Sequence, residues 1–398
     1  MAKTKVSIVK GSLTPTEREI EASVRKAVEL IGGLADIVKP GNTVLIKPNL
    51  CVARPVESAA ITNPLVVKAV AKMVKELGAK PIIGESTSIG ADTEEAYKTG
   101  QYTKLREAGF EVIDLKKKGT ETVKVPLPKA KAMKEVVLPK IVVDADVIIS
   151  VPKMKTHDNA LVTLSMKNMK GVLPDKYKRL LHHTYGVFQG IADLHTAIKP
   201  RLTVMDAIVG MEGFGPALGT PVQMGLIIAG RDFVAVDTVT TAVMGFNPLD
   251  DPIINIASKM KLGVADLNKI EVVGEPINKV RRRFQTCDEY LCQSMVLPEG
   301  FKLFVGEKTC TGCRKTVYEV LLDLKKENKL DETRGWCMVT GKVDKLPAVT
   351  KEKLLLVGVC TAKFRDKGVY VEGCAPNNRD LVKALGIQVA SGVDIDAL

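Results

Sequence analysis

The chain has 398 residues, 45% of them hydrophobic, and 58 Lys and Arg against 46 Asp and Glu give a formal net charge of +12. No apolar run approaches the roughly 18 residues of a membrane span, and the N-terminus lacks an apolar signal core, so we expect a cytoplasmic protein that contacts no membrane. Aromatic residues make up only 4% and the lysines are interleaved with glutamate, so the charge indicates a solvated surface and makes nucleic acid an unlikely partner.

The first third of the chain alternates between short apolar strands and amphipathic helices. A capping-box pair in Thr14–Glu17 starts the first helix, and the dipeptide Asn63-Pro64 starts the second. The expected elements, in order, are a strand at Lys5–Val9, a helix ending at Gly32, a strand at Thr43–Ile46, a helix from Asn63 to Gly78, a strand at Pro81–Gly84, a helix at Glu94–Ala108 and a strand at Glu111–Leu115.

The middle of the chain continues this alternation after an interruption at Pro126–Lys140, which is rich in Lys, Pro and Ala. Further elements are expected as strands at Asp146–Val151, Leu202–Met205, Met224–Ala229 and Ile270–Val273, and as helices at Val234–Met244 and Pro252–Leu262. This pattern predicts the α/β class, with a largely parallel sheet covered by helices. We expect an α/β domain over 1–280, with two lobes dividing near 115–145, and a smaller cysteine-rich α/β domain over 281–398.

Polar side chains follow several predicted strands at the point where each strand ends. Ligands bind at the carboxyl ends of parallel strands, so these side chains are expected to share one site. Lysines there would recognise an anion and a histidine would act as acid or base near neutral pH, although solvated lysines and a turn-capping histidine would explain the same residues. The catalytic candidates are Lys153, Lys155, His157 and Lys167, and the substrate-binding candidates are Lys47, Asn49, Glu85, Asn168, Asp206 and Glu212.

The two carboxylates Asp206 and Glu212 belong to a strand that runs into the glycine-rich stretch Gly210–Pro216. Carboxylates there suit a metal, an ammonium group or a lysine partner. The glycines could let the backbone approach a phosphate, but they match neither the dinucleotide fingerprint nor a P-loop.

The eight cysteines are unevenly placed, because seven of them lie beyond residue 286. Reduced cytoplasmic thiols gathered in this way favour a metal or a cluster over disulfides. The favoured ligands are Cys310, Cys313, Cys360 and Cys374, with Cys337 in reserve. Dispersed cysteines beside glycine and proline favour a [4Fe–4S] cluster, and zinc is the alternative. A resolving or second-site pair is expected for Cys287 and Cys292, and a core position for Cys51, which also follows a strand end.

Several of these motifs together resemble the domain-of-unknown-function family three-six-two, a group of uncharacterised iron–sulfur proteins. The likeness spans roughly residues 5–275, and its most specific parts are Lys153–His157 and Met166–Gly171. Many relatives carry a ferredoxin-like module with closely spaced cysteines, whereas Arg314-Lys315-Thr316 stands here in place of the third close cysteine. The resemblance implies an iron–sulfur protein and supplies no substrate.

We therefore expect an iron–sulfur-dependent oxidoreductase or lyase of anaerobic type, acting on an anionic small molecule. A redox protein partner is compatible with this reading, and so is a homo-oligomer. Two alternatives stay open: a non-enzymatic electron carrier or cluster-delivery protein, and a redox-neutral isomerase that uses Lys and His while zinc binds the cysteines.

Overall fold

The computed structural model describes residues 3–158, 160–294, 296–306, 309 and 311–388. Contacts divide the chain into two compact units, Met1–Cys287 and Asp288–Leu398. That residues 1–280 and 281–398 are separate domains stays a prediction. Within the described ranges, no helix is both long enough and apolar enough to cross a membrane.

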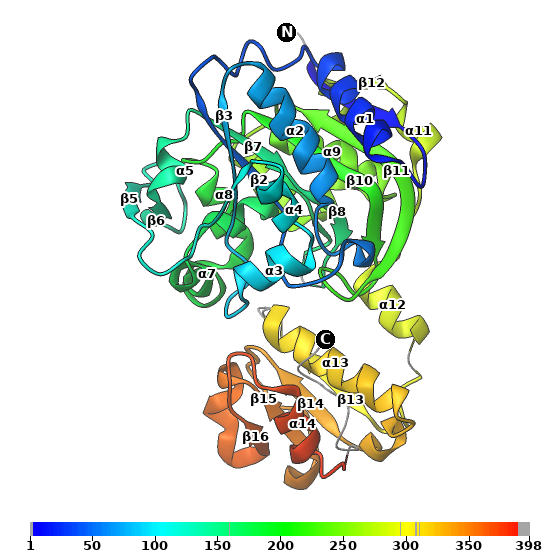
Figure 1. The fold of residues 1–398 in the computed structure, drawn as a ribbon. Coiled ribbons are helices and arrows are strands. Elements are labelled where there is room, and N and C mark those ends of the chain that lie inside the picture. Colours follow the sequence, from blue (N-terminus) through cyan, green and yellow to red (C-terminus); the bar gives the residue numbers. More distant parts are fainter. Residues whose placement is uncertain (1–2, 159, 295, 307–308, 310, 389–398) are drawn as a thin grey trace. The chain divides into compact units, whose positions relative to one another are not determined.

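The first unit is built on a ten-stranded sheet with the main order β12-β1-β11-β10-β7-β2-β3-β4 (Figure 1). Strand β8 pairs with β10 and β9 beside this path. The strands are β1 (Thr4–Lys10), β2 (Thr43–Pro48), β3 (Lys80–Glu85), β4 (Glu111–Asp114), β7 (Val147–Val151), β8 (Lys153–Thr156), β9 (Val162–Thr163), β10 (Leu202–Glu212), β11 (Thr220–Gly230) and β12 (Ile270–Gly274).

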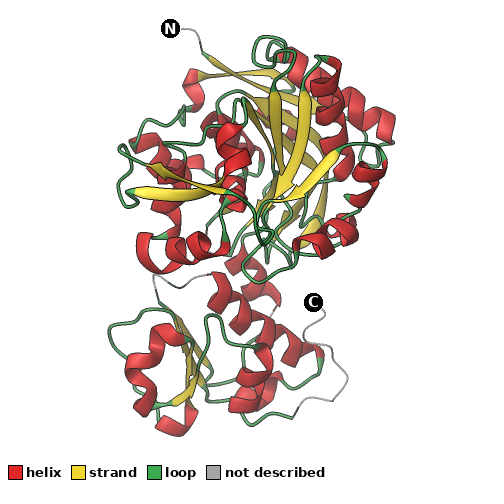
Figure 2. Ribbon diagram, turned by 60° about the vertical axis from the view of Figure 1, so that its left-hand side comes forward, coloured by secondary structure: helices red, strands yellow, loops and turns green. Residues whose placement is uncertain are grey.

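Strand β2 shows how this sheet is buried on both faces. Val44 and Ile46 pack into one hydrophobic cluster with the helices α1 (Glu17–Leu30) and α2 (Pro64–Glu76). Leu45, between them, belongs to a second cluster on the opposite face, as expected for alternating strand residues. The α/β class with a largely parallel sheet covered by helices is therefore confirmed, and Figure 2 shows the layers.

The helices that complete the first unit are mostly short. They are α3 (Thr93–Thr99), α4 (Thr103–Glu107), α5 (Lys140–Asp144), α6 (Ser165–Asn168), α7 (Asp175–Leu180), α8 (Val187–Leu194), α9 (Phe233–Val243), α10 (Pro252–Lys259) and α11 (Ile277–Val280). Single turns are η1 (Val56–Ser58), η2 (Met169–Val172), the π-helical η3 (Leu181–Tyr185), η4 (Pro248–Asp250) and η5 (Leu267–Lys269).

Several expected elements differ from the observed ones. The capping box expected within Thr14–Glu17 is formed by Thr16 and Glu19, and the strand expected at Met224–Ala229 begins at Thr220. The helix expected at Glu94–Ala108 is two helices, because Gly100 ends α3 and Gln101 then takes a φ of +62°. The strand expected at Leu202–Met205 continues to Glu212, because it forms a long antiparallel pair with β11. The first part of the glycine-rich stretch is therefore strand.

The interruption near Pro126–Lys140 is an antiparallel pair of strands outside the main sheet, β5 (Thr122–Pro126) and β6 (Glu135–Pro139). The buried carboxylate of Asp193 accepts hydrogen bonds from the backbone N–H groups of Lys131, Ala132 and Met133. This carboxylate fixes the turn between the two strands.

The second unit contains a four-stranded parallel sheet in the order β13-β14-β15-β16. Its strands are β13 (Lys302–Val305), β14 (Cys337–Thr340), β15 (Leu354–Val357) and β16 (Val369–Val371). Its helices are α12 (Cys287–Ser294), which begins at the last residue of the first unit, α13 (Thr311–Lys326) and α14 (Asn378–Ala384), with the turns η6 (Leu330–Thr333), η7 (Lys351–Lys353) and η8 (Val359–Lys367).

Candidate functional site

The candidate site lies where strands β2, β3, β8 and β10 bring their polar residues together. In register, Lys47 of β2 is opposite Ser150 of β7, and Lys153 of β8 is opposite Asp206 of β10. These side chains are buried, although the lysines were expected to recognise an anion.

Lys47 is completely buried, and its ammonium group is fully used by the protein. Its Nζ atom donates to Glu85 Oε2 at 2.9 Å, to the Pro48 carbonyl at 2.6 Å and to Asn168 Oδ1 at 3.2 Å. An ammonium group has three N–H donors, so none remains for a substrate. Burial lowers the pKa of Lys47, and the Glu85 carboxylate acts against that change.

Lys153 and Asp206 form a second buried ion pair, with 2.9 Å between Nζ and Oδ2. Asp206 also accepts from the backbone N–H of Asn63, the N-cap of α2. The two buried pairs Lys47–Glu85 and Lys153–Asp206 thus hold together the loops that leave the strands. A direct contact with substrate stays a prediction for these four residues. In the structure their charges are paired with one another.

Lys155 is a third buried lysine, and it has a different kind of partner. Its Nζ atom lies 3.4 Å from Cys51 Sγ, 2.6 Å from the Ala60 carbonyl oxygen and 3.0 Å from the Pro216 carbonyl oxygen. Burial lowers the pKa of Lys155, and Cys51 is the first of the groups that oppose this shift. Cys51, expected to be a core residue, is half-buried beside this lysine.

His157 connects a carboxylate to a lysine. Its Nδ1 atom lies 2.8 Å from Asp158 Oδ1, and its Nε2 atom contacts Lys167 Nζ. Burial, followed by the charge of Lys167, lowers the pKa of His157 to about 4. The ring is therefore neutral at pH 7, its Nδ1 accepts from the backbone N–H of Ala160, and its contact with Lys167 is suited to exchanging a proton.

A second lysine–histidine pair, which is not among the predicted site residues, lies beside the first. Lys170 Nζ lies 2.7 Å from His182 Nε2. Lys167 and Lys170 are half-buried and three residues apart, at the end of α6 and the start of η2, so they point in similar directions. Burial and then the charge of Lys170 hold the pKa of Lys167 well below its ordinary value. The three-residue spacing was the signal that could have identified Lys170.

The remaining substrate-binding candidates divide into two groups. Asn168 joins the network, since its Nδ2 donates to the Lys47 carbonyl, and Asn49 Nδ2 lies 3.4 Å from Asn168 Oδ1. Asn49 Oδ1 is buried and has no hydrogen-bond donor among the residues that the structure describes. The carboxylate of Glu212 is instead 3.2 Å from Arg282 and accepts from the Gln285 backbone N–H.

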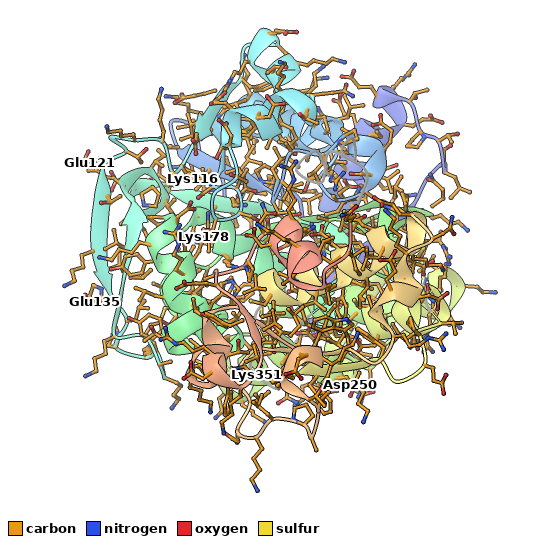
Figure 3. The ribbon with its side chains drawn as sticks, turned by 90° about the horizontal axis from the view of Figure 1, so that it is seen from below. Lys116, Glu121, Glu135, Lys178, Asp250 and Lys351 are labelled. Atoms are coloured by element: carbon orange, nitrogen blue, oxygen red, sulfur yellow. The ribbon has the colours of Figure 1, made fainter. Side chains whose placement is uncertain are left out.

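A fourth buried lysine clamps the loop that follows β3. Lys178 donates to the carbonyl oxygens of Ser86 and Thr87, and burial lowers its pKa to about 8. Lys178 and Lys116 lie near each other in Figure 3, and both contact Asp175.

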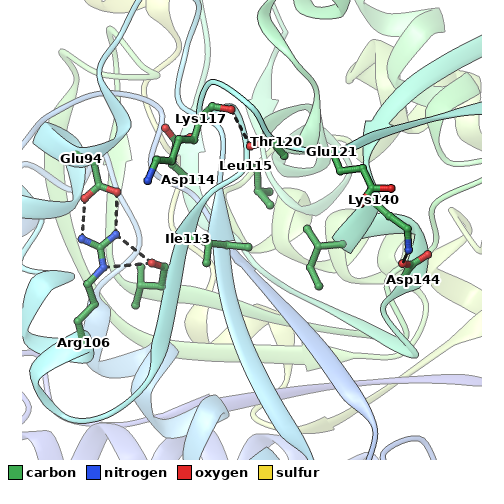
Figure 4. A pocket seen from close by; sticks show the side chains of 12 residues that line it. Glu94, Arg106, Ile113, Asp114, Leu115, Lys117, Thr120, Glu121, Lys140 and Asp144 are labelled. Atoms are coloured by element: carbon green, nitrogen blue, oxygen red, sulfur yellow. Dashed lines mark hydrogen bonds and ion pairs between the residues drawn. The ribbon is translucent and has the colours of Figure 1, made fainter.

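A surface hollow of about 490 Å³ lies at the edge of the sheet near β4 (Figure 4). Arg106 forms two hydrogen bonds with Glu94 there, and Lys140 pairs with Asp144. None of the sequence-predicted site residues lines this hollow, and the charged pairs in it are already satisfied.

Three of the predicted cysteine ligands belong to segments that meet at one end of the second unit's sheet. Gly358 and Gly373, which follow β15 and β16, lie against Cys313 of α13: a Cβ atom added to Gly358 would be 2.9 Å from Cys313 Sγ and 3.4 Å from the Gly373 carbonyl oxygen. The backbone N–H of Val359 donates to that same carbonyl oxygen at 3.0 Å. The segments carrying Cys313, Cys360 and Cys374 are therefore neighbours.

Cys337, the reserve ligand, lies at the other end of the sheet. It is the first residue of β14 and pairs in register with Leu354, the first residue of β15, whereas Cys360 follows the last residue of β15. Its thiol is buried among Val339 and Leu356, and burial raises its pKa. The structure thus gives Cys337 a place in the core.

The other cysteines are only partly described. Cys310 lies outside the described residues, as does the side chain of Cys292, while Cys287 is buried at the end of the first unit. Among the side chains that are described, no group of three His, Cys, Asp or Glu is arranged to hold a single metal ion. A [4Fe–4S] cluster is held by four Cys thiolates, and the segments that carry three of the candidate ligands converge at one end of this sheet.

Comparison with known proteins gives three findings. The sequence model described as Domain of unknown function (DUF362) matches residues 44–242. The thylakoid-associated protein sll1697 of Synechocystis sp. (strain ATCC 27184 / PCC 6803 / Kazusa) is 33% identical over 248 residues, which are 61% of this chain and 75% of that protein. The lactate racemase apoprotein of Thermoanaerobacterium thermosaccharolyticum aligns with 85% of this chain and 69% of its own, at 12% identity and a TM-score of 0.37, which is too low to define a shared fold.

Proposed function

The chain belongs to the DUF362 family, and from that premise we propose that it is an enzyme acting on a small anionic molecule, with a [4Fe–4S] cluster in its second unit. The residues matched to the family, 44–242, include the whole lysine–histidine network of the first unit. The C-terminal cysteines lie outside that match, so the cluster rests on their own arrangement.

One observation carries the proposal: Lys167 and Lys170, half-buried and three residues apart, each contact a histidine, His157 and His182 respectively. Two ammonium groups this close repel each other, and each lowers the tendency of the other to stay charged. A bound anion would remove that repulsion. Carboxylate or phosphate oxygens are the ligands that such a pair recognises.

The same pairs supply acid–base chemistry. His157 Nδ1 accepts a hydrogen bond from the backbone N–H of Ala160 at 3.2 Å, so the neutral ring carries its proton on Nε2, which faces Lys167. When Lys167 exchanges a proton with a bound molecule, only the charge of the lysine changes, and His157, which stays neutral, holds Lys167 Nζ in place. This chain therefore offers one anion-binding lysine, Lys170, beside one lysine, Lys167, that exchanges a proton.

In the second unit, Cys313, Cys360 and Cys374 would hold the cluster together with Cys310. A bound [4Fe–4S] cluster supplies one-electron transfer or, through an open iron position, Lewis-acid activation of an oxygen. The protein's own contribution is the glycine at 358, whose missing side chain leaves room beside Cys313.

Anion binding is tested by thermal unfolding of the full chain with inorganic phosphate and with small dicarboxylates as probes. We expect at least one probe to raise the unfolding temperature of the wild type and of Lys129→Met, which removes an exposed lysine from the turn before β6. The same probe should have less than half that effect on Lys170→Met. Equal shifts in all three proteins would overturn the anion site.

The cluster is tested on protein purified without oxygen, by visible absorption and by EPR after dithionite reduction. We expect a broad band near the blue end of the spectrum and an EPR signal at low temperature, both lost in Cys360→Ala. A colourless protein that binds one zinc would instead support the redox-neutral isomerase, in which Lys167 and His157 act without electron transfer.

The electron-carrier alternative is favoured by one observation, the exposed side chain of Cys374. A cluster bound at this end of the sheet could exchange electrons with a partner protein. Cluster reduction that requires a protein donor, without turnover of any small anion, would favour that alternative.

A further inference from the structure

The buried group Cys51–Lys155 has a chemistry that the proposed function does not use. Lys155 Nζ has three acceptors around it: Cys51 Sγ, the Ala60 carbonyl oxygen and the Pro216 carbonyl oxygen. A neutral amine has two N–H donors and an ammonium group has three. The arrangement therefore matches the charged ammonium form of Lys155.

A buried ammonium needs a negative charge nearby, because its desolvation is costly. Lys47 has Glu85 and Lys153 has Asp206, each at 2.9 Å. Among the described residues no carboxylate is paired with Lys155. Of its three acceptors, only the sulfur of Cys51 can become an anion by losing a proton.

The cysteine belongs to the same electrostatic group as the proposed site and has exposed surface. Cys51 is half-buried whereas Lys155 is fully buried, so of the two residues only Cys51 can be reached by a reagent. The charge of Lys155 in turn lowers the pKa of Lys167, the proton-exchanging lysine. In the same loop, Asn49 carries a buried side-chain oxygen with no donor in the described chain, a group that an N–H or O–H of a ligand would satisfy.

We propose that Cys51 is a nucleophilic thiolate whose proton resides on Lys155, and that it attacks an electrophilic carbon of an anionic molecule. The anionic part of this proposal rests on the proposed function of the lysine–histidine pairs. The thiol proton moves to Lys155 Nζ, the sulfur electron pair forms the new S–C bond, and the leaving group departs with the electrons of the bond that breaks.

The preference for an anion follows from charge balance. Once the sulfur is bonded to carbon it is neutral, and the buried ammonium of Lys155 has lost its counter-charge. An adduct that brings a carboxylate restores the balance, whereas an uncharged adduct leaves the ammonium uncompensated.

The test is alkylation of the full-length protein with iodoacetamide, followed by mass spectrometry of the tryptic peptide that carries Cys51, which contains no other cysteine. In the wild type, the rate at pH 6.5 should stay within about threefold of the rate at pH 8.5. In Lys155→Met the thiol ionises unaided, so its rate should fall by roughly tenfold or more between these pH values. Free N-acetylcysteine, measured in parallel, gives the reference profile even if the variant does not fold.

The second readout is the ratio of the rates with iodoacetate and iodoacetamide. For Cys51 we expect this ratio to exceed that of N-acetylcysteine by at least threefold, and to return to the reference value in Lys155→Met. A Cys51 profile that matches N-acetylcysteine in both measurements overturns the proposal. If phosphate still stabilises such a protein through Lys170, the proposed function stands, whereas a reactive Cys51 without any stabilising anion would sink the proposed function alone.

Discussion

The sulfur of Cys51 lies 3.4 Å from the ammonium nitrogen of Lys155, in the position that a carboxylate holds beside each of the other two buried lysines at the strand ends. The three lysines come from adjacent parts of one sheet, so their charges act on one another. Burial lowers the pKa of Lys47, for example; Glu85 and then Cys51 act against this shift, and Lys155 adds to it.

This pair should be visible in stability. Cys51→Ala removes the counter-charge of a buried ammonium, so we expect it to lower the free energy of unfolding by roughly 3 kcal/mol. Adding Lys155→Met should recover more than half of that loss, because the uncompensated charge is gone. The measurement is urea unfolding followed by circular dichroism, with the fluorescence of Trp336, the one tryptophan, as a separate report on the second unit. Additive losses would contradict the ion pair.

His157 should make stability depend on pH in the acid range. Its pKa in the folded protein is about 4, below the ordinary 6.5, so the unfolded chain binds the proton first. Stability is therefore lost as the pH falls from 6.5 to 4, by at most about 3 kcal/mol. We expect the stability advantage of the wild type over His157→Gln to shrink by that amount between pH 7 and pH 4. Parallel curves for the two proteins would show that the ring is not held neutral.

Lys178 should act in the alkaline range. Its folded pKa of about 8 lies below the ordinary 10.5, so between these values the unfolded chain binds a proton that the folded chain does not. The destabilisation that results from burying the charged form of Lys178 is fully present below pH 8 and disappears as the pH rises to 10.5. Relative to Lys178→Met, the wild type should gain about 3 kcal/mol between pH 8 and pH 10.5. Guanidinium unfolding of both proteins at several pH values measures this, and a constant difference would count against it.

Two glycines of the second unit provide a matched test of the space beside Cys313. Gly358 and Gly335 both have positive φ, +86° and +73°, so alanine strains the backbone similarly at each. At Gly358 the added Cβ would be 2.9 Å from Cys313 Sγ, whereas at Gly335 nothing lies within 4 Å. We expect Gly358→Ala to lose most of its iron and Gly335→Ala to keep it. Equal iron contents in the two variants would show that the space beside Gly358 is not needed for the cluster.

The sequence was informative where local chemistry decides the outcome. Alternating apolar strands predicted the sheet, and Asn63-Pro64 marked the start of α2, where the Asn63 side chain accepts from the Leu65 N–H. It also identified Lys47, Lys153 and Lys155 as candidate site residues, because they come after the predicted strands and do not lie on predicted helix faces.

Burial and pairing could not be read in the same way. The sequence around a lysine at a strand end looks the same whether the lysine binds a substrate or a buried carboxylate. The partner of Lys47, Glu85, is 38 residues away in the chain. Lys170 lies in η2 and His182 in η3, so their contact depends on how the fold brings these two elements together. Cys337 follows a glycine and a tryptophan, and nothing in that local sequence distinguishes it from the candidate ligands. The register of β14 with β15 places it at the end of the sheet opposite to Cys313 and Cys360.

The most direct test of the central claim is the iron and acid-labile sulfide content of the full chain purified without oxygen, compared for Cys313→Ala and Cys337→Ala. We expect about four irons and four sulfides per chain in the wild type and in Cys337→Ala, because Cys337 lies in the core at the far end of the sheet. Cys313→Ala should lose most of both. Zinc in place of iron, or the same metal content in all three proteins, would contradict a [4Fe–4S] cluster held by Cys313, Cys360 and Cys374.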